Sequence, residues 1–321
     1  MARQARSWEK KLFSRRYPVV GADAFGTPAN IVEDIKKVLP DGILSKLRLR
    51  LVGTITKVGA AAGAATGREN PEELIQSIQF TSNPSFGGTF RRLYSMRSLL
   101  IQQIMDRGYS VRGTDLTDAA GAVAVDFEVE LPVKFLNAMR PIEFGLPMRA
   151  LTGLEVNIQC GGRSRLFTGG TPPTWDFSAL NVELWAEQDR YVSRNAVPVD
   201  AFGRPAFHFA EEYQVQNVIT QNQADYAIEL EGGYEYSSLL ILAERDNVPV
   251  DDIITDISVE SGARQWLGRG DNNAAHIRRK MLERGIPSES VTGAYFVDLL
   301  PDGMASRAAD ALEEKLRLIL N

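Results

Sequence analysis

A nine-residue stretch occurs twice in this chain, and this repeat limits what the chain can fold into. Residues 74–82 (LIQSIQFTS) and 253–261 (IITDISVES) place apolar side chains at the same positions. Each copy is followed, in the same order, by a helical pattern ending in Arg-Gly, a strand pattern with Val-Asp and then Leu-Pro, and a final apolar strand. The offset between equivalent features drifts from 179 to 162 residues, too long for a solenoid repeat. The sequence therefore predicts two copies of one domain.

Strand patterns dominate both copies, and each copy contains one helix. The helices are expected from about Ser95 to Arg107 and from about Asp271 to Arg284, each with a polar residue at the start and a glycine just past the end. The strand patterns come in runs and do not alternate with helices, which argues against βαβ units. We therefore expect an all-β fold: two tandem jelly-roll β-sandwich domains, each with one inserted helix, plus an N-terminal helical arm.

Two strand patterns predict a buried face and a charged face. Apolar side chains alternate with basic ones over residues 46–51 (KLRLRL) and with acidic ones over residues 123–131 (VAVDFEVEL). In the second copy, strands are expected at about Phe207–Ile219, Tyr226–Leu230, Ser237–Glu244, Ile253–Glu260, Tyr295–Leu300 and Leu316–Leu320.

Residues 1–16 differ in charge from the rest of the chain. They carry a net charge of +5, so the remaining residues carry about −10 of the total of −5. On a helix, Trp8, Leu12 and Phe13 would lie near one another among basic residues, which is typical of a short interfacial helix on anionic lipid or polyphosphate. The alternative is a basic tail that lies on the acidic body of a neighbouring subunit. The candidate contact residues are Arg3, Arg6, Trp8, Lys10, Lys11, Leu12, Phe13, Arg15 and Arg16.

These patterns divide the chain into three parts: an arm and linker over 1–44, a first jelly roll over 45–200 and a second over 201–321. Glycine and proline mark Tyr17–Pro28 as a linker, and a short helix is expected at about Asn30–Val38. Turn-forming residues also cluster between Tyr191 and Pro205, where the two rolls should meet.

The sequence favours no enzyme chemistry. The chain has two histidines, His208 and His276, and neither is near a nucleophile motif. Asp126 and Asp298 recur at equivalent places, but carboxylates in separate copies of one domain would not normally meet, so a structural role is favoured over catalysis. We predict no catalytic residue and no cofactor.

Metal binding and thiol chemistry are similarly disfavoured. Asp246, Asp251 and Asp252 could hold a calcium ion, but the loop lacks EF-hand spacing and a solvated turn is favoured. Cys160 is the single cysteine and lies on the apolar side of a strand, which predicts core packing. No apolar run approaches the length of a membrane span, and no secretory signal is visible.

The repeated units LIQSIQFTS…MDRG…VDFEVELP and IITDISVES…LERG…FVDLLPDG, with a basic arm and no catalytic site, resemble the double-jelly-roll major capsid proteins of tailless icosahedral, membrane-containing bacterial viruses, such as tectiviruses and corticoviruses. The resemblance covers about residues 45–321. It implies homotrimers of pseudo-hexagonal outline that tile an icosahedral shell. It also implies an arm that reaches an internal membrane or neighbouring subunits, contacts with minor capsid proteins, and a virion capsid assembled in the host cytoplasm. Direct nucleic acid contact is the less favoured role for the arm.

Two other functions fit part of the pattern. A jelly-roll carbohydrate-binding protein, such as a spike or lectin, could use Trp175 and Trp266, which are expected in loops. A two-domain β-sandwich glycosidase would need a carboxylate pair that the sequence does not reveal.

Overall fold

The computed structural model divides the chain into two compact units, Met1–Leu100 with Val111–Gln214 and Ile101–Ser110 with Val215–Asn321. The structure describes residues 6–18, 29–58, 66–67, 71–84, 90–107, 121–132, 146–161, 167–168, 174–190, 217–219, 223–231, 235–236, 238–245, 248–261, 264–267, 273–286, 291–299, 309–310 and 316–321.

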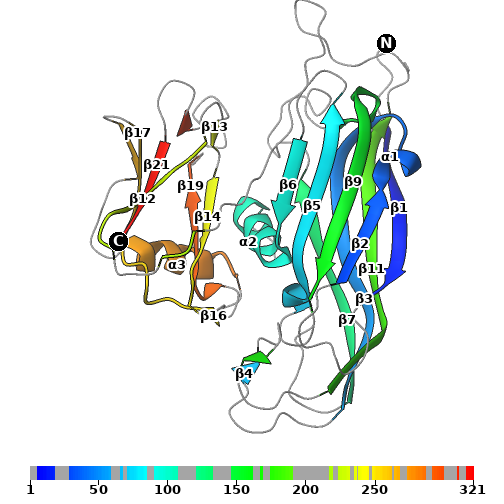
Figure 1. Cartoon of the computed structure of the whole chain (residues 1–321), viewed down its shortest axis with the longest axis horizontal. Coiled ribbons are helices and arrows are strands. Elements are labelled where there is room, and N and C mark those ends of the chain that lie inside the picture. The colour runs from blue at the N-terminus through cyan, green and yellow to red at the C-terminus, as the bar shows by residue number, and fades with distance from the viewer. Residues whose placement is uncertain are drawn as a thin grey trace, which may run out of the picture. The chain divides into compact units, whose positions relative to one another are not determined.

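The first unit is a sandwich of two antiparallel sheets, seen as two layers of long strands in Figure 1. One sheet has the order β1 (Arg6–Arg16), β11 (Thr174–Arg190), β3 (Ile43–Val58) and β7 (Gly121–Pro132), with the short β8 (Leu146–Pro147) also on β3. The other has the order β2 (Ala29–Asp34), β9 (Leu151–Cys160), β5 (Ile75–Pro84) and β6 (Phe90–Tyr94).

The pairing of these strands is that of a jelly roll. Among the eight long strands taken in chain order, the first pairs with the eighth (β1 with β11) and the second with the seventh (β2 with β9). The third pairs with the sixth (β3 with β7) and the fourth with the fifth (β5 with β6). An eight-stranded chain that folds back on itself in this order makes two sheets of four, as observed.

Short elements connect the long strands. They are α1 (Ile35–Val38), β4 (Thr66–Gly67), β10 (Phe167–Thr168) and the 3₁₀ turns η1 (Pro71–Leu74) and η3 (Met148–Ala150). The longer helix α2 (Met96–Arg107) follows β6. Its residues up to Leu100 belong to the first unit, and those from Ile101 belong to the second.

The core lies between the two sheets, and period-2 alternation explains it. Inward side chains of both layers are almost completely buried, among them Leu49, Leu51, Phe127, Val129, Val182, Leu184, Phe80, Val156 and Ile158. Many of their alternate neighbours on β3, β7 and β11 are charged and stand on the outer face, where Glu130 and Glu183 are themselves nearly buried. The alternation predicted for residues 46–51 and 123–131 is confirmed.

The expected N-terminal helix is wrong, because residues 6–16 form strand β1. It pairs with β11 from Arg6 opposite Arg190 to Arg16 opposite Asn181. A β-bulge at Leu12 shifts the register between Lys11 and Phe13. The extra residue breaks the two-residue alternation that marks a strand. The apolar residues of this segment therefore have a helix-like spacing in the sequence. The short helix expected at Asn30–Val38 is also mostly wrong, since residues 29–34 are β2 and helix is confined to α1.

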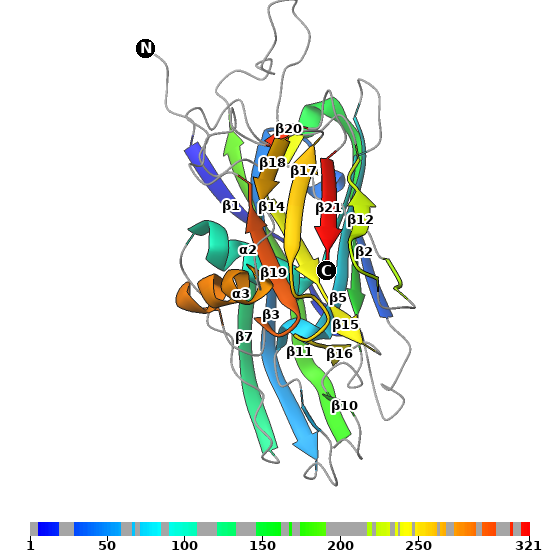
Figure 2. The ribbon, with the colours of Figure 1, turned by 90° about the vertical axis from the view of Figure 1, so that its left-hand side faces the viewer.

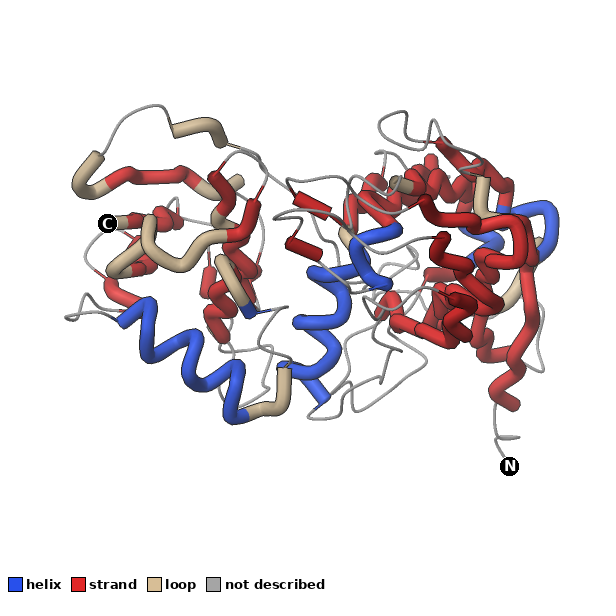
Figure 3. Tube along the Cα trace, turned by 90° about the horizontal axis from the view of Figure 1, so that it is seen from below, coloured by secondary structure: helices blue, strands red, loops and turns tan. Residues whose placement is uncertain are grey.

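The second unit is built from shorter strands, seen in Figure 2. One sheet has the order β12 (Tyr226–Glu229), β21 (Leu316–Leu320), β17 (Ile257–Ser261) and β18 (Arg264–Leu267). Three strand pairs accompany it: β14 (Ser238–Leu242) with β19 (Ala294–Asp298), β13 (Glu235–Tyr236) with β20 (Ala309–Asp310), and β15 (Glu244–Arg245) with β16 (Val248–Pro249). The helix α3 (Asn273–Glu283) packs against β19 and is drawn in blue in Figure 3.

The second unit repeats the strand order of the first. Its sheet β12-β21-β17-β18 corresponds to β2-β9-β5-β6, and its pair β14–β19 corresponds to β3–β7. The helix α3 follows β18 as α2 follows β6. The repeat predicted from residues 74–82 and 253–261 is therefore confirmed at the level of topology. Counterparts of β1 and β11 are not among the described residues of this unit.

Candidate functional site

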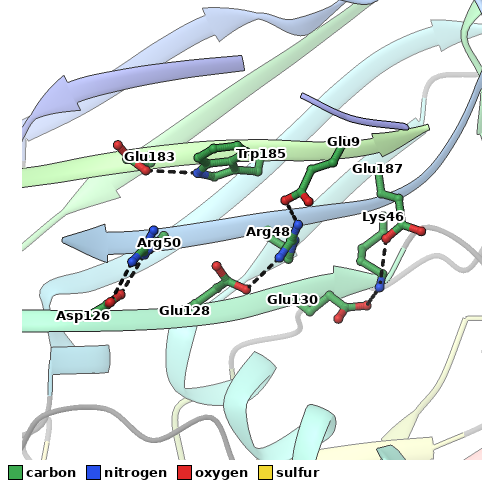
Figure 4. A network of polar contacts seen from close by, with 10 residues as sticks. All are labelled: Glu9, Lys46, Arg48, Arg50, Asp126, Glu128, Glu130, Glu183, Trp185 and Glu187. Atoms are coloured by element: carbon green, nitrogen blue, oxygen red, sulfur yellow. Dashed lines mark hydrogen bonds and ion pairs between the residues drawn. The ribbon is translucent and has the colours of Figure 1, made fainter. Parts of the chain in front are cut away.

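The most organised polar surface among the described residues is the outer face of the sheet β1-β11-β3-β7, which we call the charge-paired face (Figure 4). Basic side chains stand on the central strand β3, and acidic ones stand on β7 and β11 at either side. Its members are Glu9, Lys11, Lys46, Arg48, Arg50, Asp126, Glu128, Glu130, Glu183, Trp185 and Glu187.

Three basic residues of β3, Lys46, Arg48 and Arg50, contact acidic residues on neighbouring strands. Arg50 forms a two-pronged pair with Asp126, with Nε–Oδ1 and Nη2–Oδ2 distances of 2.7 and 2.6 Å. Lys46 Nζ lies 3.2 Å from Glu130 Oε1 and 3.1 Å from Glu187 Oε2.

Arg48 continues this pattern by bridging the two sides of the sheet. It reaches Glu128 on β7 at 3.4 Å and also contacts Glu9 on β1. Opposite charges on adjacent strands stabilise a sheet, whereas like charges placed opposite each other would destabilise it. Lys46, Arg48 and Arg50 therefore tie the flanking acidic strands together.

Hydrogen bonds to Asp126 and Glu183 lower the pKa values of these two carboxyl groups. The Arg50 guanidinium lowers the pKa of Asp126, because it donates to the charged form and opposes the effect of burial. Burial alone would raise the pKa of Glu183. Hydrogen bonds from Lys11, Trp185 and Ser14 outweigh burial, so the pKa of Glu183 lies below its ordinary value. Hydrogen bonds therefore favour the ionised forms of Asp126 and Glu183, and the face as a whole has six acidic side chains and four basic ones.

The candidate contact residues of the arm mostly hold β1 in the first unit. Lys11 Nζ lies 2.6 Å from Glu183 Oε1 and 4.8 Å from the centre of the Trp185 ring. Lys10 Nζ donates to the carbonyl oxygen of Val38 at 3.1 Å. Arg15 Nε donates to Glu33 of β2 at 2.7 Å, which links the edges of the two sheets.

The remaining arm residues fall into three groups. Phe13 is buried, whereas Leu12 at the bulge is half-buried and Arg16 is exposed. Arg6 and Trp8 lie on β1, and their side chains are outside the described part of the structure, as is the whole of Arg3.

Tyr17 anchors the end of β1 and was not singled out by the sequence. Its ring is buried against Phe177, with centroids 5.2 Å apart. Its hydroxyl lies 2.7 Å from the carbonyl oxygen of Leu74 and also contacts that of Gly161. Burial raises the pKa of Tyr17 well above its ordinary value, so the hydroxyl stays protonated as a donor. Tyr17 therefore links the end of β1 to the opposite sheet.

In the second unit, Asp251 supports a turn. Its carboxylate accepts a hydrogen bond from the backbone N–H of Gly293 at 2.6 Å and lies 2.6 Å from Arg278 Nη2. Asp252 lies 3.4 Å from Arg245, and Asp246 lies outside the described residues. No group of three metal-ligating side chains occurs within the described part of the chain. These contacts favour the turn over the calcium site.

The other candidates lie in ordinary structural positions. Cys160 is fully buried in the core as predicted, and burial raises its pKa to about 12. His276 is exposed on α3, and His208 lies outside the described residues. The loop positions expected for Trp175 and Trp266 are wrong, since they lie on β11 and β18. Across the described residues, no helix is long and apolar enough to cross a membrane.

Sequence reasoning found half of the charge-paired face and missed the other half. The basic residues of β3 and the acidic residues of β7 were both predicted to face outward, and their complementary charges could have indicated that the strands are neighbours. The outer face of β11 follows in the same way from the inward alternation of Leu180, Val182 and Leu184, but the contribution of β1 could not be found. The bulge at Leu12 hides the strand period, and pairing of the first strand with the last leaves no local signal.

No protein-family model and no curated protein matches the chain in sequence. Solved structures do match. The crystal structure of the STIV major capsid protein superimposes with a TM-score of 0.63 at 12% identity, over 98% of this chain and 95% of that one. The atomic structure of Sulfolobus turreted icosahedral virus gives 0.62 at 13% identity, over 98% and 89%. A quasi-atomic model of the PBCV-1 virus capsid gives 0.52 at 12% identity, over 100% and 85%. The chain therefore has the double-jelly-roll fold of these viral capsid proteins.

Proposed function

We propose that this chain is a viral major capsid protein, a structural subunit without enzymatic activity. The observation that carries the proposal is the match along 98% of the chain to the STIV major capsid protein, which includes both units and not a single jelly roll. A jelly roll alone occurs in many unrelated proteins, whereas two in tandem within one chain are a narrower architecture.

The proposed assembly is a homotrimer of pseudo-hexagonal outline that tiles an icosahedral shell. Two copies of one roll per chain give three chains six similar bodies, which suits a near-sixfold tile. The charge-paired face supports a stable subunit for such a shell, because its four basic side chains all pair with acidic side chains of neighbouring strands. The acidic body should keep free subunits apart before assembly.

The role of the N-terminal residues is narrower in this proposal than in the sequence prediction. Lys10, Lys11, Phe13 and Arg15 have partners within the first unit, so they hold the roll together. Contact with an internal membrane, minor capsid proteins or neighbouring subunits is assigned to residues 1–5 and to the exposed Arg16. A bacterial host and assembly in its cytoplasm complete the proposal and rest on the sequence resemblance.

The solution mass of the purified chain tests this proposal. Light scattering after size exclusion should give three times 35.5 kDa for the smallest stable species. Electron microscopy of the same peak should show hexagonal outlines. A folded, stable monomer at micromolar concentration would contradict the trimer, and turnover of a chromogenic glycoside would contradict the absence of activity.

A further inference from the structure

Helix α3 of the second unit presents a row of basic side chains to solvent. His276, Lys280 and Arg284 follow one another at four-residue spacing, about 6 Å apart along the axis, which places them on one side of a helix. Arg284 belongs to this row because its N–H bonds to the carbonyl oxygen of Lys280 and so continues the helical turn. All three residues are exposed, and within the described part of the chain none of their side chains forms an ion pair. We call this row the basic ridge.

The rest of α3 fixes the direction of the basic ridge. The other charged residues of the helix have partners: Arg278 Nη2 lies 2.6 Å from Asp251 Oδ2, and Arg279 Nε lies 3.0 Å from Glu283 Oε1. A different side of the helix is apolar and buried, and α3 packs against β19. The buried residues are Ala274, Ile277 and Met281. The basic ridge therefore points away from the core of its own unit.

The corresponding helix α2 is used differently. Its residues from Met96 to Met105 are all buried or half-buried, and Arg97, the one basic residue among them, is 6% exposed. The two helices occupy the same place in the strand order, so the basic ridge does not follow from the shared topology. It is a property of α3 itself.

The charges of the second unit are segregated along the chain. Residues 215–321 hold 10 Lys and Arg against 18 Asp and Glu, a net charge of −8. Residues 264–284, which include β18 and α3, hold six against two, a net charge of +4. The remainder of 215–321 therefore carries −12. Because charged side chains lie mostly at the surface, each copy of the unit offers both a basic helix and an acidic surface that complements it.

Two other anionic partners fit the basic ridge less well. A nucleic acid carries negative charge along its whole length, so it would also meet the net charge of −8 of the unit around the ridge. A bilayer takes up apolar side chains beside the basic ones. The exposed apolar residue of α3, Leu282, is two residues from Lys280 and therefore faces roughly the opposite way around the helix. An acidic protein surface requires neither a wholly basic unit nor an apolar neighbour.

We propose that the basic ridge docks on the acidic surface of the second unit in another copy of this chain. The contact joins two different surfaces, so copies associate head to tail, and a ring forms where the rotation between them closes. It gives the proposed homotrimer a contact and in that respect rests on the proposed function. Exposed ion pairs contribute little affinity each, so the expected role of the ridge is to set the register and the rate of association.

Zero-length cross-linking identifies the partner of the ridge. A carbodiimide joins an amine directly to a carboxylate in contact with it, and Lys280 is the amine of the basic ridge. In a mixture of isotopically light and heavy full-length copies, we expect links between peptides of different isotope, from Lys280 to Asp or Glu of residues 215–321. An absence of links between chains, or links from Lys280 only to the first unit, would contradict the proposal.

Lys37 is the matched control for this experiment. Its side chain is 81% exposed on α1 of the first unit and lies 3.5 Å from Asp34. It should link to Asp34 within its own chain and not to a second copy. Links between chains that are as frequent from Lys37 as from Lys280 would reflect random collision and would overturn the assignment.

Removing the charge of the ridge tests its effect on association. The double variant Lys280→Gln with Arg284→Gln should weaken the association of copies about tenfold in sedimentation at low salt. Lys37→Gln is the control and should leave association unchanged. Amide exchange in α3 should stay as slow as in the unmodified protein, which reports that the helix remains folded. Unchanged association of the folded double variant would contradict the proposal.

The same variants distinguish the other partners. Binding to a single-stranded oligonucleotide and to vesicles with anionic lipid is measured beside association. If the double variant loses either binding while its copies associate as before, the ridge serves that partner and the proposal is wrong. A three-chain species without Lys280 links between chains would contradict this inference alone. Lys280 links between chains without a three-chain species would contradict the proposed trimer alone.

Discussion

The two units share one strand order and differ in what they build on it. In the first unit, β3 and β11 run for 16 and 17 residues, and their outer face carries ion pairs between neighbouring strands. In the second, β14 and β19 run for five residues each, and β14 is apolar and half-buried throughout. The same order of strands, with one helix inserted, is thus compatible with very different strand lengths and surfaces. A duplicated fold can keep its topology while the two copies differ in strand length and in surface chemistry.

The largest expected effect comes from removing β1. Deleting residues 1–16 takes away the edge strand β1, the buried Phe13 and the contacts of Lys11 and Arg15, from a chain whose total stability is on the order of 5–15 kcal/mol if it is typical. We expect the first unit to lose amide protection in β11 while the second unit keeps its protection, as measured by hydrogen exchange and mass spectrometry. Deletion of residues 1–5 is the control and should change neither unit. Full protection of β11 after the larger deletion would show that β1 is dispensable.

A smaller effect specific to the first unit is expected at Gly53. This residue has φ of +140° and lies beside a bulge in β11, where a Cβ atom would stand 2.1 Å from the carbonyl oxygen of Ala179. Gly53→Ala should lower the free energy of unfolding by roughly 1–3 kcal/mol, as measured by denaturant titration. Gly153→Ala on β9 is the matched control, because nothing lies within 4 Å of its added methyl group. Equal stabilities of the two variants would argue against the close approach at Gly53.

The corresponding test in the second unit concerns Asn273. Its side-chain amide accepts a hydrogen bond from the N–H of Ile257 at 2.7 Å and donates one to the carbonyl of the same residue at 2.6 Å, which ties α3 to β17. Asn273→Ala should lower the free energy of unfolding of the second unit by about 1–3 kcal/mol and speed amide exchange in β17. The rate of amide exchange in β5 of the first unit should not change. Asn273→Asp keeps the acceptor oxygen, so its free energy of unfolding should lie between those of the unmodified protein and of Asn273→Ala. Equal exchange in β5 and β17 would mean that the units unfold together.

Acid should affect the charge-paired face more than the second unit. Because the pKa values of Asp126 and Glu183 are lowered in the folded state, the stability that they add is present above the ordinary carboxyl range. It is lost progressively as the pH falls from the ordinary carboxyl range through the lowered pKa values of the folded state. The first unit should therefore lose protection before the second in an acid titration followed by hydrogen exchange.

The smallest expected effect comes from removing the ion pair between Arg50 and Asp126. Arg50→Met should flatten the acid response of the first unit and cost under about 1 kcal/mol at neutral pH, because Asp126 is largely exposed. Arg279→Met on α3, which breaks an exposed pair with Glu283, is the matched control and should leave the first unit unchanged. An identical acid response in both variants would show that the Arg50 pair is irrelevant to it.

The sequence predicted the repeated architecture, because the apolar periods of residues 74–82 and 253–261 and the glycines after each helix are local signals. It also predicted the outward charges of β3 and β7. It failed where long-range pairing overrides local pattern. Residues 6–16 have a helix-like spacing of Trp8, Leu12 and Phe13, yet they pair with β11 across a bulge. Tyr17 gave no signal, since its role depends on Leu74 and Gly161, which are distant in sequence.

The pairing of β1 with β11 also sets an order of events during synthesis. The first strand of the roll leaves the ribosome well over a hundred residues before its partner, which takes on the order of 10–30 s at typical elongation rates. During that interval, Phe13 and Tyr17 have no sheet to enter, and the nascent first unit can close only when Thr174–Arg190 emerges. Contacts so distant in sequence make folding slow, and the six charged residues of β1 give the waiting segment the solubility that it then needs.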